Sequence, residues 1–255
     1  VVSVDFFTPR VDDARDFVTM FGKNEFLILK FDKCKNWGLI AEACIERLGN
    51  TLYNQPANIN TRTLDHLKGK VVVVFSAGGL RELAMQPRPG GQPWSRAGIL
   101  GFKNLYSGGA YDAAFHGLQY YGKGGTSVKK PFGKIQQNIK KQTKILEGSK
   151  GTHADTLSMM YWTTTGIFES IQARNGRMWD APNVHRLKKL WANGLREHVE
   201  QRFVGYDTDG VALMGMRRRT HMPNIIMIDF ADQDKVRVIR ELNDMTDQQI
   251  AALQG

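Results

Sequence analysis

Charged residues close two apolar segments of this sequence, and these residues are the best suited to chemistry. Residues 24–32, NEFLILKFD, end with Lys30 and Asp32, which strand alternation places on one face. Residues 224–230, NIIMIDF, carry Asp229 near their end. Charges on a buried strand are costly unless they serve each other or a ligand. We therefore expect a binding site at these strand ends or, for the first pair, a local ion pair.

Four short apolar runs predict β-strands that are buried on both faces, at residues 24–32, 70–79, 156–166 and 224–230. Helical spacing of apolar residues predicts helices between them, at residues 11–21, 40–49, 184–195 and 236–242. Asp232 is expected to cap the last of these helices. This alternation predicts an α/β fold with a parallel sheet, whose functional residues gather at the carboxyl ends of the strands, as in a (β/α) barrel.

Composition sets the class of the protein. The 255 residues are 42% hydrophobic and 24% charged, which is ordinary for a globular chain, and no apolar run is long enough to cross a bilayer. Cys34 and Cys44 lack metal-ligand spacing, so no metal residues are assigned. The first residues, VVSVDFFTPR, lack the features of a signal peptide, so we expect a mature, excised or truncated chain.

The net charge of +10 indicates an anionic partner. Seven lysines and no acid lie between Lys123 and Lys144, and three arginines form a second cluster at 217–219. Nucleic acid is the weaker expectation, because no helix-turn-helix, zinc-finger or RNA-recognition signature is present. The lysine run also reads as a solvated helix face. Its apolar residues give it a basic amphipathic pattern that could lie on an anionic membrane surface: Phe132, Ile135, Ile139 and Leu146.

Four segments in order resemble strands from the later half of the phosphatidylinositol-specific phospholipase C catalytic (X) domain: EFLILKFDKCKNW, LDHLKGKVVVVFSAGG, LSMMYWTTTG and PNIIMIDFAD. The resemblance covers most of the chain and is weakest over residues 80–150. It implies a TIM-type barrel, incomplete at the N-terminus with strands four to eight present, and residues 1–255 as the C-terminal portion of the catalytic domain. It also implies two histidines as general base and general acid, and an arginine or a calcium ion beside the phosphate.

The resemblance assigns roles to individual residues. Asp229 matches the aspartate that orients the general-base histidine. Lys30 and Asp32 match the position of a lysine that contacts inositol or of an acid that binds calcium. Ser76 stands where bacterial members carry an arginine, which leaves the head group undetermined. Tyr161, Trp162 and Thr163 would line the substrate pocket, although aromatic residues of a buried strand more often belong to the core.

Histidines are the least certain part of this assignment. His116 precedes Gly117, as in the His-Gly pair that carries the second histidine of the family, although its place in the chain order differs. His153 lies in a Gly-Thr-His sequence that precedes a strand instead of following one. The key histidine is therefore expected upstream of this chain, so the isolated chain is expected to be inactive alone or to complete its barrel by unusual means. The remaining histidines are expected to be structural: His66, His185, His198 and His221.

Together these observations predict a phosphoric diester hydrolase that cleaves inositol phospholipid to diacylglycerol and inositol phosphate at a membrane surface. No cofactor other than a possible calcium ion is implied, and a secreted or membrane-peripheral location is favoured over a cytoplasmic one. The alternative from another class is a non-catalytic binder of anionic lipid surfaces. A third reading is a phosphodiesterase of the same superfamily with a different head group.

Overall fold

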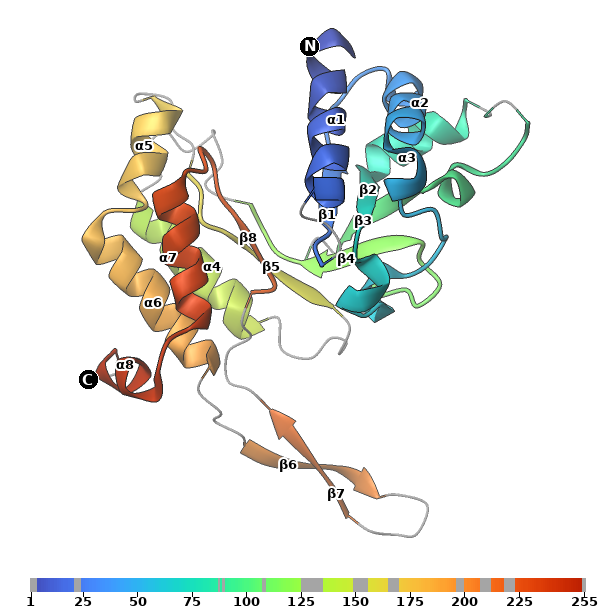
Figure 1. Cartoon of the computed structure of the whole chain (residues 1–255). Helices are drawn as coiled ribbons and strands as arrows, with labels where there is room; N and C mark the ends of the chain where they lie inside the picture. Colours follow the sequence, from blue (N-terminus) through green and yellow to red (C-terminus); the bar gives the residue numbers. More distant parts are fainter. Residues whose placement is uncertain are drawn as a thin grey trace. The chain divides into compact units, whose positions relative to one another are not determined.

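The chain folds as an α/β protein of two compact units, Val1–Tyr120 and Tyr121–Gly255, which Figure 1 shows. The structure is a computed structural model that describes residues 4–20, 24–86, 88, 90–106, 109–124, 135–148, 156–164, 170–195, 200–206, 212–217 and 223–253. In both units strands pair in parallel, which confirms the predicted class.

The first unit contains a parallel sheet whose strands follow one another in chain order: β1 (Leu27–Phe31), β2 (Val71–Ser76), β3 (Ile99–Asn104) and β4 (Gly117–Tyr121). Its described helices are α1 (Val4–Met20), α2 (Trp37–Leu48) and α3 (Ala77–Ala84). Four single 3₁₀ turns complete it: η1 (Gly49–Thr51), η2 (Ile59–Thr61), η3 (Leu64–Leu67) and η4 (Trp94–Ala97). The predicted strands at 24–32 and 70–79 are confirmed as β1 and β2, and the helices at 11–21 and 40–49 as α1 and α2.

One face of this sheet packs against helices. Alternate residues of the strands, such as Phe31 and Phe75, form a core with Val11 of α1 and Trp37 of α2. The Phe75 ring lies 5.3 Å from the Phe31 ring and 5.0 Å from the Trp37 ring, measured between centroids. Residues 71–75 of β2 are apolar and buried on both faces, as expected for a strand that lies between β1 and β3.

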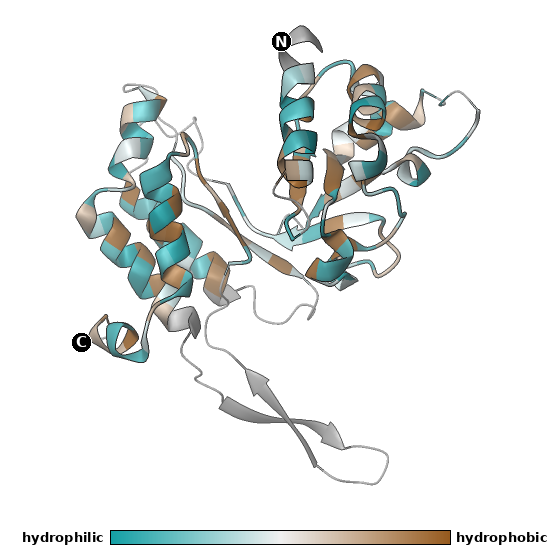
Figure 2. Cartoon of the chain, viewed as in Figure 1, coloured by the Kyte–Doolittle hydropathy of each residue, from teal (hydrophilic) through white to brown (hydrophobic). Residues whose placement is uncertain are grey.

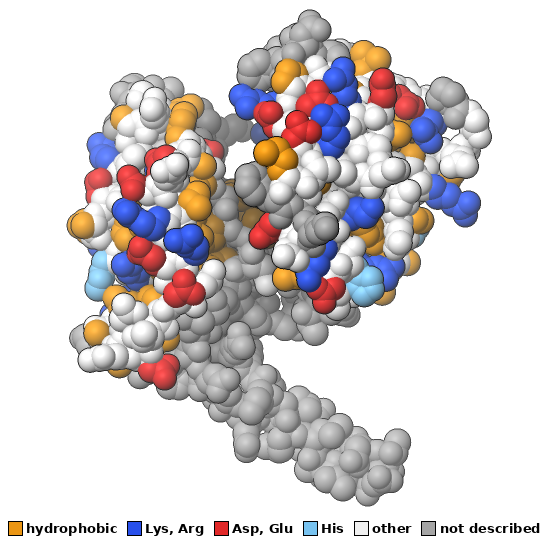
Figure 3. Space-filling view, in the orientation of Figure 1, with side chains coloured by type: hydrophobic (Ala, Val, Ile, Leu, Met, Phe, Trp, Pro, Cys, Tyr) orange, Lys and Arg blue, Asp and Glu red, His pale blue; other side chains and the backbone are white. Residues whose placement is uncertain are grey.

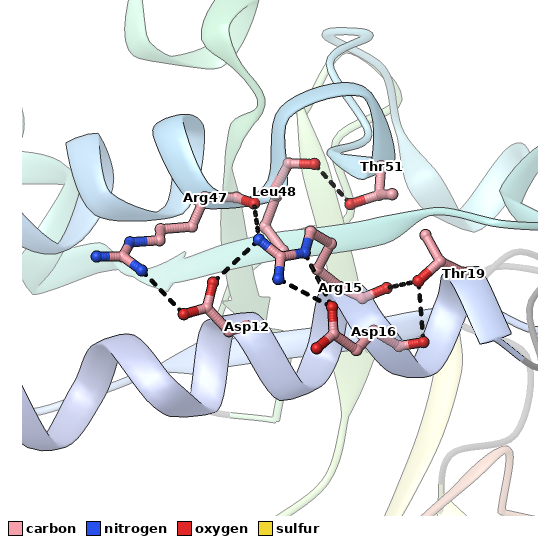
Figure 4. A network of polar contacts seen from close by, with 7 residues as sticks. All are labelled: Asp12, Arg15, Asp16, Thr19, Arg47, Leu48 and Thr51. Atoms are coloured by element: carbon pink, nitrogen blue, oxygen red, sulfur yellow. Dashed lines mark hydrogen bonds and ion pairs between the residues drawn. The ribbon is translucent and has the colours of Figure 1, made fainter.

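Helices α1 and α2 lie side by side and are joined by charged residues at their surface (Figure 4). The carboxylate of Asp12 lies 2.9 Å from Arg47 and 3.1 Å from Arg15, and Arg15 also contacts Asp16 at 2.9 Å. Acidic and basic side chains accordingly lie together on this face of the first unit (Figure 3). Such exposed pairs each contribute only about 0.2–1 kcal/mol, so the apolar core beneath them dominates the packing of the two helices.

The beginning of β4 is held from both sides. The Gly101 N–H donates to the His116 carbonyl, and the Gly117 N–H donates to the Ala57 carbonyl at 2.9 Å. Two residues further on, the Asn60 side chain accepts from the Gln119 N–H and donates to the Gln119 carbonyl, both at 2.7 Å. The residues before η2 and within it thus complete the hydrogen bonding of this short strand.

The second unit pairs β5 (Leu157–Tyr161) in parallel with β8 (Ile225–Met227) and contains an antiparallel hairpin of β6 (Glu200–Tyr206) and β7 (Ala212–Arg217). Its described helices are α4 (Ile135–Gly148), α5 (Ile171–Arg177), α6 (Ala181–Leu195), α7 (Gln233–Asn243) and α8 (Asp247–Ala252). The strands predicted at 156–166 and 224–230 are confirmed as β5 and β8, and the helices predicted at 184–195 and 236–242 as α6 and α7. Hydrophobic and hydrophilic residues alternate along α6 and α7 (Figure 2), as amphipathic helices require.

The core of the second unit joins its strands to its helices. Met160 and Trp162 are buried with Ile139 and Leu146 of α4 and Leu187 of α6. The Trp162 indole N–H donates to the Met178 carbonyl at 3.1 Å, so the one polar atom of this ring is paired. Trp162 is thus a core residue, as the alternative reading of this strand predicted.

Candidate functional site

Lys30 and Asp32 lie at the carboxyl end of β1, as predicted. Their charged groups are 3.8 Å apart, and the side chains are 25% and 46% exposed. The Lys30 ammonium also lies 4.7 Å from the centroid of the Phe102 ring, which is a cation–π contact. The local ion pair is therefore confirmed, and Lys30 keeps enough exposure to meet a ligand as well.

Lys30 and Phe102 lie on the face of the sheet opposite to the core shared with α1 and α2. The register pairs Lys30 with Val74 and Ser76 with Phe102, so Lys30, Ser76 and Phe102 share one face by strand alternation. Phe102 then stacks on Tyr120 of β4, with 4.3 Å between ring centroids. A cation and two aromatic rings thus form a row across the carboxyl halves of β1, β3 and β4.

Sequence reasoning missed the two aromatic members of this row. Phe102 lies on β3 and Tyr120 on β4, and neither strand was predicted. A usable signal existed in the apolar segments GILGF (98–102) and GLQYY (117–121), which are short and contain glycine. Ser76, the departure from the family pattern, ends β2 directly before α3 and is half-buried.

A second strand end carries Tyr161, Thr163 and Asp229. Tyr161 pairs with Met227 in the register, and the Trp162 N–H donates to the Met227 carbonyl at 2.9 Å. Because Trp162 points into the core, its neighbours Tyr161 and Thr163 belong to the other face, where both are half-buried. Asp229, two residues after Met227, is exposed and makes no hydrogen bond or ion pair with the described residues.

Two buried amides of α4 fix this end of β5. The Asn138 amide donates to the Tyr161 carbonyl at 3.1 Å and to the Thr163 carbonyl at 2.7 Å. The Gln142 carbonyl oxygen accepts from the Tyr161 N–H at 3.0 Å, and its amide donates to the Asn138 side-chain oxygen at 3.2 Å and to the Lys123 carbonyl at 3.1 Å. Both side chains are completely buried. They replace strand-to-strand hydrogen bonds where β5 ends.

The turn after Asp229 is held by Lys235. The Lys235 ammonium donates to the Phe230 carbonyl at 2.5 Å and to the Asp232 carboxylate at 2.6 Å. The Asp232 side chain also accepts from the Lys235 N–H at 2.9 Å, which confirms Asp232 as the N-cap of α7. These bonds, led by the Lys235 side chain, lower the pKa of Asp232 below its ordinary value of 3.8. Phe230 is held at φ 54°, a conformation costly for a bulky residue.

His116 lies at the opposite ends of the strands from Lys30 and Asp32. It directly precedes β4, so it is at the amino end of a parallel strand, whereas Lys30 and Asp32 are at the carboxyl end. The structure therefore does not bring His116 together with these residues. Its exposed side chain lines a pocket of about 580 Å³ beside α3.

The remaining histidines contribute no group to these strand ends in the described structure. His66 is exposed in η3, where its ring nitrogen contacts the Thr63 hydroxyl at 2.7 Å, and His185 is exposed on α6. His153, His198 and His221 lie outside the described residues.

Of the lysine run, the structure describes residues 123–124 and 135–144, and the latter belong to α4. Within α4, Ile135, Ile139 and Leu146 pack into the core of the second unit, so the expectation that these three residues could face a membrane is wrong. Lys140 and Lys144, one turn apart, are exposed. Phe132 and residues 218–219 lie outside the described residues, as does the Arg217 side chain.

Lys141 faces inward on the same helix. Its ammonium donates to the Gly124 carbonyl, and burial, together with the nearby charge of Lys123, lowers the pKa of Lys141 below 10.5. This lysine therefore ties α4 to the segment after β4 and is not part of the exposed basic face.

The chemistry of the cysteines and acids gives no metal site in the described parts. Burial raises the pKa of Cys44 to about 12, and burial also raises the pKa of the half-buried Cys34. No group of three or more His, Cys, Asp or Glu side chains gathers among the described residues.

None of the helices that the structure describes combines the length and the apolarity needed to cross a membrane. Searches among protein-family models, curated proteins and solved structures found nothing that matches this chain.

Proposed function

We propose that this chain belongs to a phosphoric diester hydrolase of the phosphatidylinositol-specific phospholipase C type, which cleaves inositol phospholipid to diacylglycerol and inositol phosphate. In this proposal residues 1–255 are the later portion of one TIM-type barrel. The parallel strand–helix order supports the proposal, because polar groups at the carboxyl ends of parallel strands are where such folds bind substrate.

The observation that carries the proposal is the environment of Lys30. Its ammonium is partly exposed at the end of β1, on the face turned away from the helices, and is held between Asp32 at 3.8 Å and the Phe102 ring at 4.7 Å. A lysine positioned in this way supplies a fixed positive charge to a phosphate or a sugar hydroxyl. The Lys30 ammonium lies at this strand end and pairs with Asp32, so the proposal assigns the positive charge beside the phosphate to Lys30.

Asp229 would serve the acid/base step. Its carboxylate is exposed at the end of β8 and has no partner among the described residues, while Lys235 holds the turn behind it through the Phe230 carbonyl. A carboxylate on a rigid strand end can accept the N–H of a histidine and keep the opposite ring nitrogen ready to take the proton of the attacking hydroxyl. The proposal assigns no histidine of the described parts to this step.

The second candidate function is electrostatic binding to an anionic lipid surface without turnover. The observation that favours it is the exposed pair Lys140 and Lys144 on α4, with the opposite side of that helix packed into the core. Each lysine near such a surface contributes about 1 kcal/mol, and the attraction falls with salt.

Vesicle co-sedimentation separates the two functions even where turnover is low. Vesicles would contain phosphatidylcholine with equal molar amounts of phosphatidylinositol or phosphatidylserine. Site-specific binding predicts more chain on phosphatidylinositol vesicles, and predicts that Lys30→Met removes the difference. The surface binder predicts equal binding to both lipids. That binding would be lost in the double variant Lys140→Gln, Lys144→Gln and unchanged by Lys30→Met, and this result would reject the phospholipase proposal. Release of inositol phosphate in the same tubes would establish the enzyme directly.

A further inference from the structure

The pocket beside α3 is large enough for a small molecule and belongs entirely to the first unit. Its volume is about 580 Å³, within the usual range of about 300–1,000 Å³ for small-molecule sites. It is bounded by α3, by the segment that contains η4, by the beginning of β3 and by the residues before β4. It therefore lies at the amino ends of the parallel strands, whereas Lys30 lies at the carboxyl end of β1.

The walls of this pocket are mainly apolar. Leu83 and Ile99 are core residues, and the Phe115 ring packs closely against Gly101, where a Cβ would come within 2.4 Å of the ring. The Trp94 indole N–H already donates to the Leu83 and Gln86 carbonyls, both at 3.1 Å. The indole consequently offers only apolar surface to a ligand, so the body of the ligand should be apolar or aromatic.

Polar side chains with remaining hydrogen-bonding capacity also line the pocket. Arg88 lines the pocket, and its Nε lies 3.4 Å from the Glu42 carboxylate but makes no hydrogen bond although it is buried. His116 also lines the pocket, and its ring makes no hydrogen bond with the described residues. Gln92 and Ser95 add side chains that can donate or accept. The one acid in the lining, Asp112, already accepts from the Ala114 N–H at 2.9 Å.

We propose that this pocket binds a small anion with an apolar or aromatic body, with Arg88 as the principal partner of the anionic group. A guanidinium stays charged at every physiological pH and pairs with carboxylate or phosphate through two parallel hydrogen bonds. The nearest contact of Glu42 is with Nε, at 3.4 Å, and the Arg88 guanidinium makes no hydrogen bond with the described residues, so its donors remain for the ligand. His116 supplies a second donor, which gives this histidine a role that is independent of phosphodiester cleavage.

Phenyl phosphate is the probe that tests this proposal, with inorganic phosphate, benzyl alcohol and benzylamine as comparisons. The full chain would be titrated by calorimetry and by NMR with the Trp94 indole N–H as reporter. Saturable binding of phenyl phosphate is expected, about tenfold or more tighter than for benzyl alcohol, as a charge-assisted hydrogen bond requires. Benzylamine should bind no better than benzyl alcohol.

Arg88→Gln should lower the affinity for phenyl phosphate by about tenfold and leave the affinity for benzyl alcohol unchanged. His116→Asn should lower the affinity for phenyl phosphate by less. Arg81→Gln is the matched control, because Arg81 is an exposed arginine on α3 that does not line the pocket. Absence of saturable binding, equal affinity for benzylamine, or equal weakening by Arg81→Gln would overturn the proposal. Inorganic phosphate binding as tightly as phenyl phosphate would overturn the part that assigns an apolar body.

Discussion

Two amide side chains hold the backbone at the end of β5 by hydrogen bonds. Asn138 and Gln142 stand on a helix that the sequence pattern reads as basic and amphipathic, yet both are completely buried. Each uses both ends of its amide group in hydrogen bonds to backbone or to the other. Buried amides of this kind stabilise a structure only while every partner is present, because an unpaired carbonyl in the core is costly.

Asn138→Ala should destabilise the second unit by about 2–3 kcal/mol, because it removes the donor of the Tyr161 and Thr163 carbonyls and leaves a cavity. Urea unfolding followed by tryptophan fluorescence would measure the loss, since Trp162 lies between these two residues. Gln137→Ala, at the exposed neighbouring position of the same helix, is the control and should change stability by less than about 0.5 kcal/mol. Similar losses in both variants would show that helix propensity, and not the amide, is responsible.

The two cysteines should differ sharply in reactivity. The thiolate is the reactive form, and burial raises the pKa of Cys44 to about 12, whereas Cys34 is half-buried. At pH 8 a thiol reagent should label Cys34 slowly and Cys44 only after the chain is unfolded. Mass spectrometry of tryptic peptides would measure both rates. Labelling of Cys44 in the folded chain at the rate of Cys34 would contradict the packing of α2 against β2.

At the scale of elements, short continuous apolar runs were sufficient to predict β1, β2, β5 and β8. They were not sufficient for β3 and β4, because glycines interrupt these strands for a packing reason. At Gly117, with φ 146°, a Cβ would come within 2.0 Å of the Gly101 carbonyl oxygen, so the two strands approach where no side chain fits. Of the row formed by Lys30, Phe102 and Tyr120, only Lys30 was therefore predicted from the sequence.

The burial of Asn138 and Gln142 could not be predicted from the sequence. Polar residues of an amphipathic helix are expected at its solvent face, and only the end of β5 beside α4 explains why these two are buried. The role of Asp232 was predicted correctly, because an N-cap is a local signal that depends on a few neighbouring residues. Lys30 and Asp32 were likewise located by alternation along a single strand.

Helix α7 should depend on the ionised form of its cap. The pKa of Asp232 is lowered in the folded chain, chiefly by the Lys235 side chain, so its contribution is present above the ordinary value of 3.8 and is lost as the pH falls through the lower folded value. Asp232→Ala should lower the melting temperature at pH 7 and have a smaller effect at pH 2, as measured by circular dichroism. A loss that is the same at both pH values would contradict a charge-assisted cap.

At the scale of the whole molecule, the net charge of +10 favours anionic ligands at a distance, and local geometry must then decide where they bind. The described structure offers two chemically different places in the first unit. The carboxyl edge presents Lys30 beside aromatic rings, and the pocket beside α3 presents Arg88 within apolar walls. Charge attraction alone would be strongly weakened by salt, whereas binding fixed by geometry would keep its order of preference among ligands.

The proposed head-group site at Lys30 is tested most directly by titrating the chain with glycerophosphoinositol, a soluble head group that needs no membrane. Saturable binding is expected, with shifts of the Phe102 and Tyr120 ring resonances in NMR spectra. Lys30→Met, which keeps the apolar stem and removes the charge, should weaken binding by about tenfold or more. Lys35→Met, at an exposed position just after β1, should leave the affinity unchanged. Failure of glycerophosphoinositol to bind, or equal weakening by both substitutions, would contradict a phosphorylated head group at the carboxyl edge of this sheet.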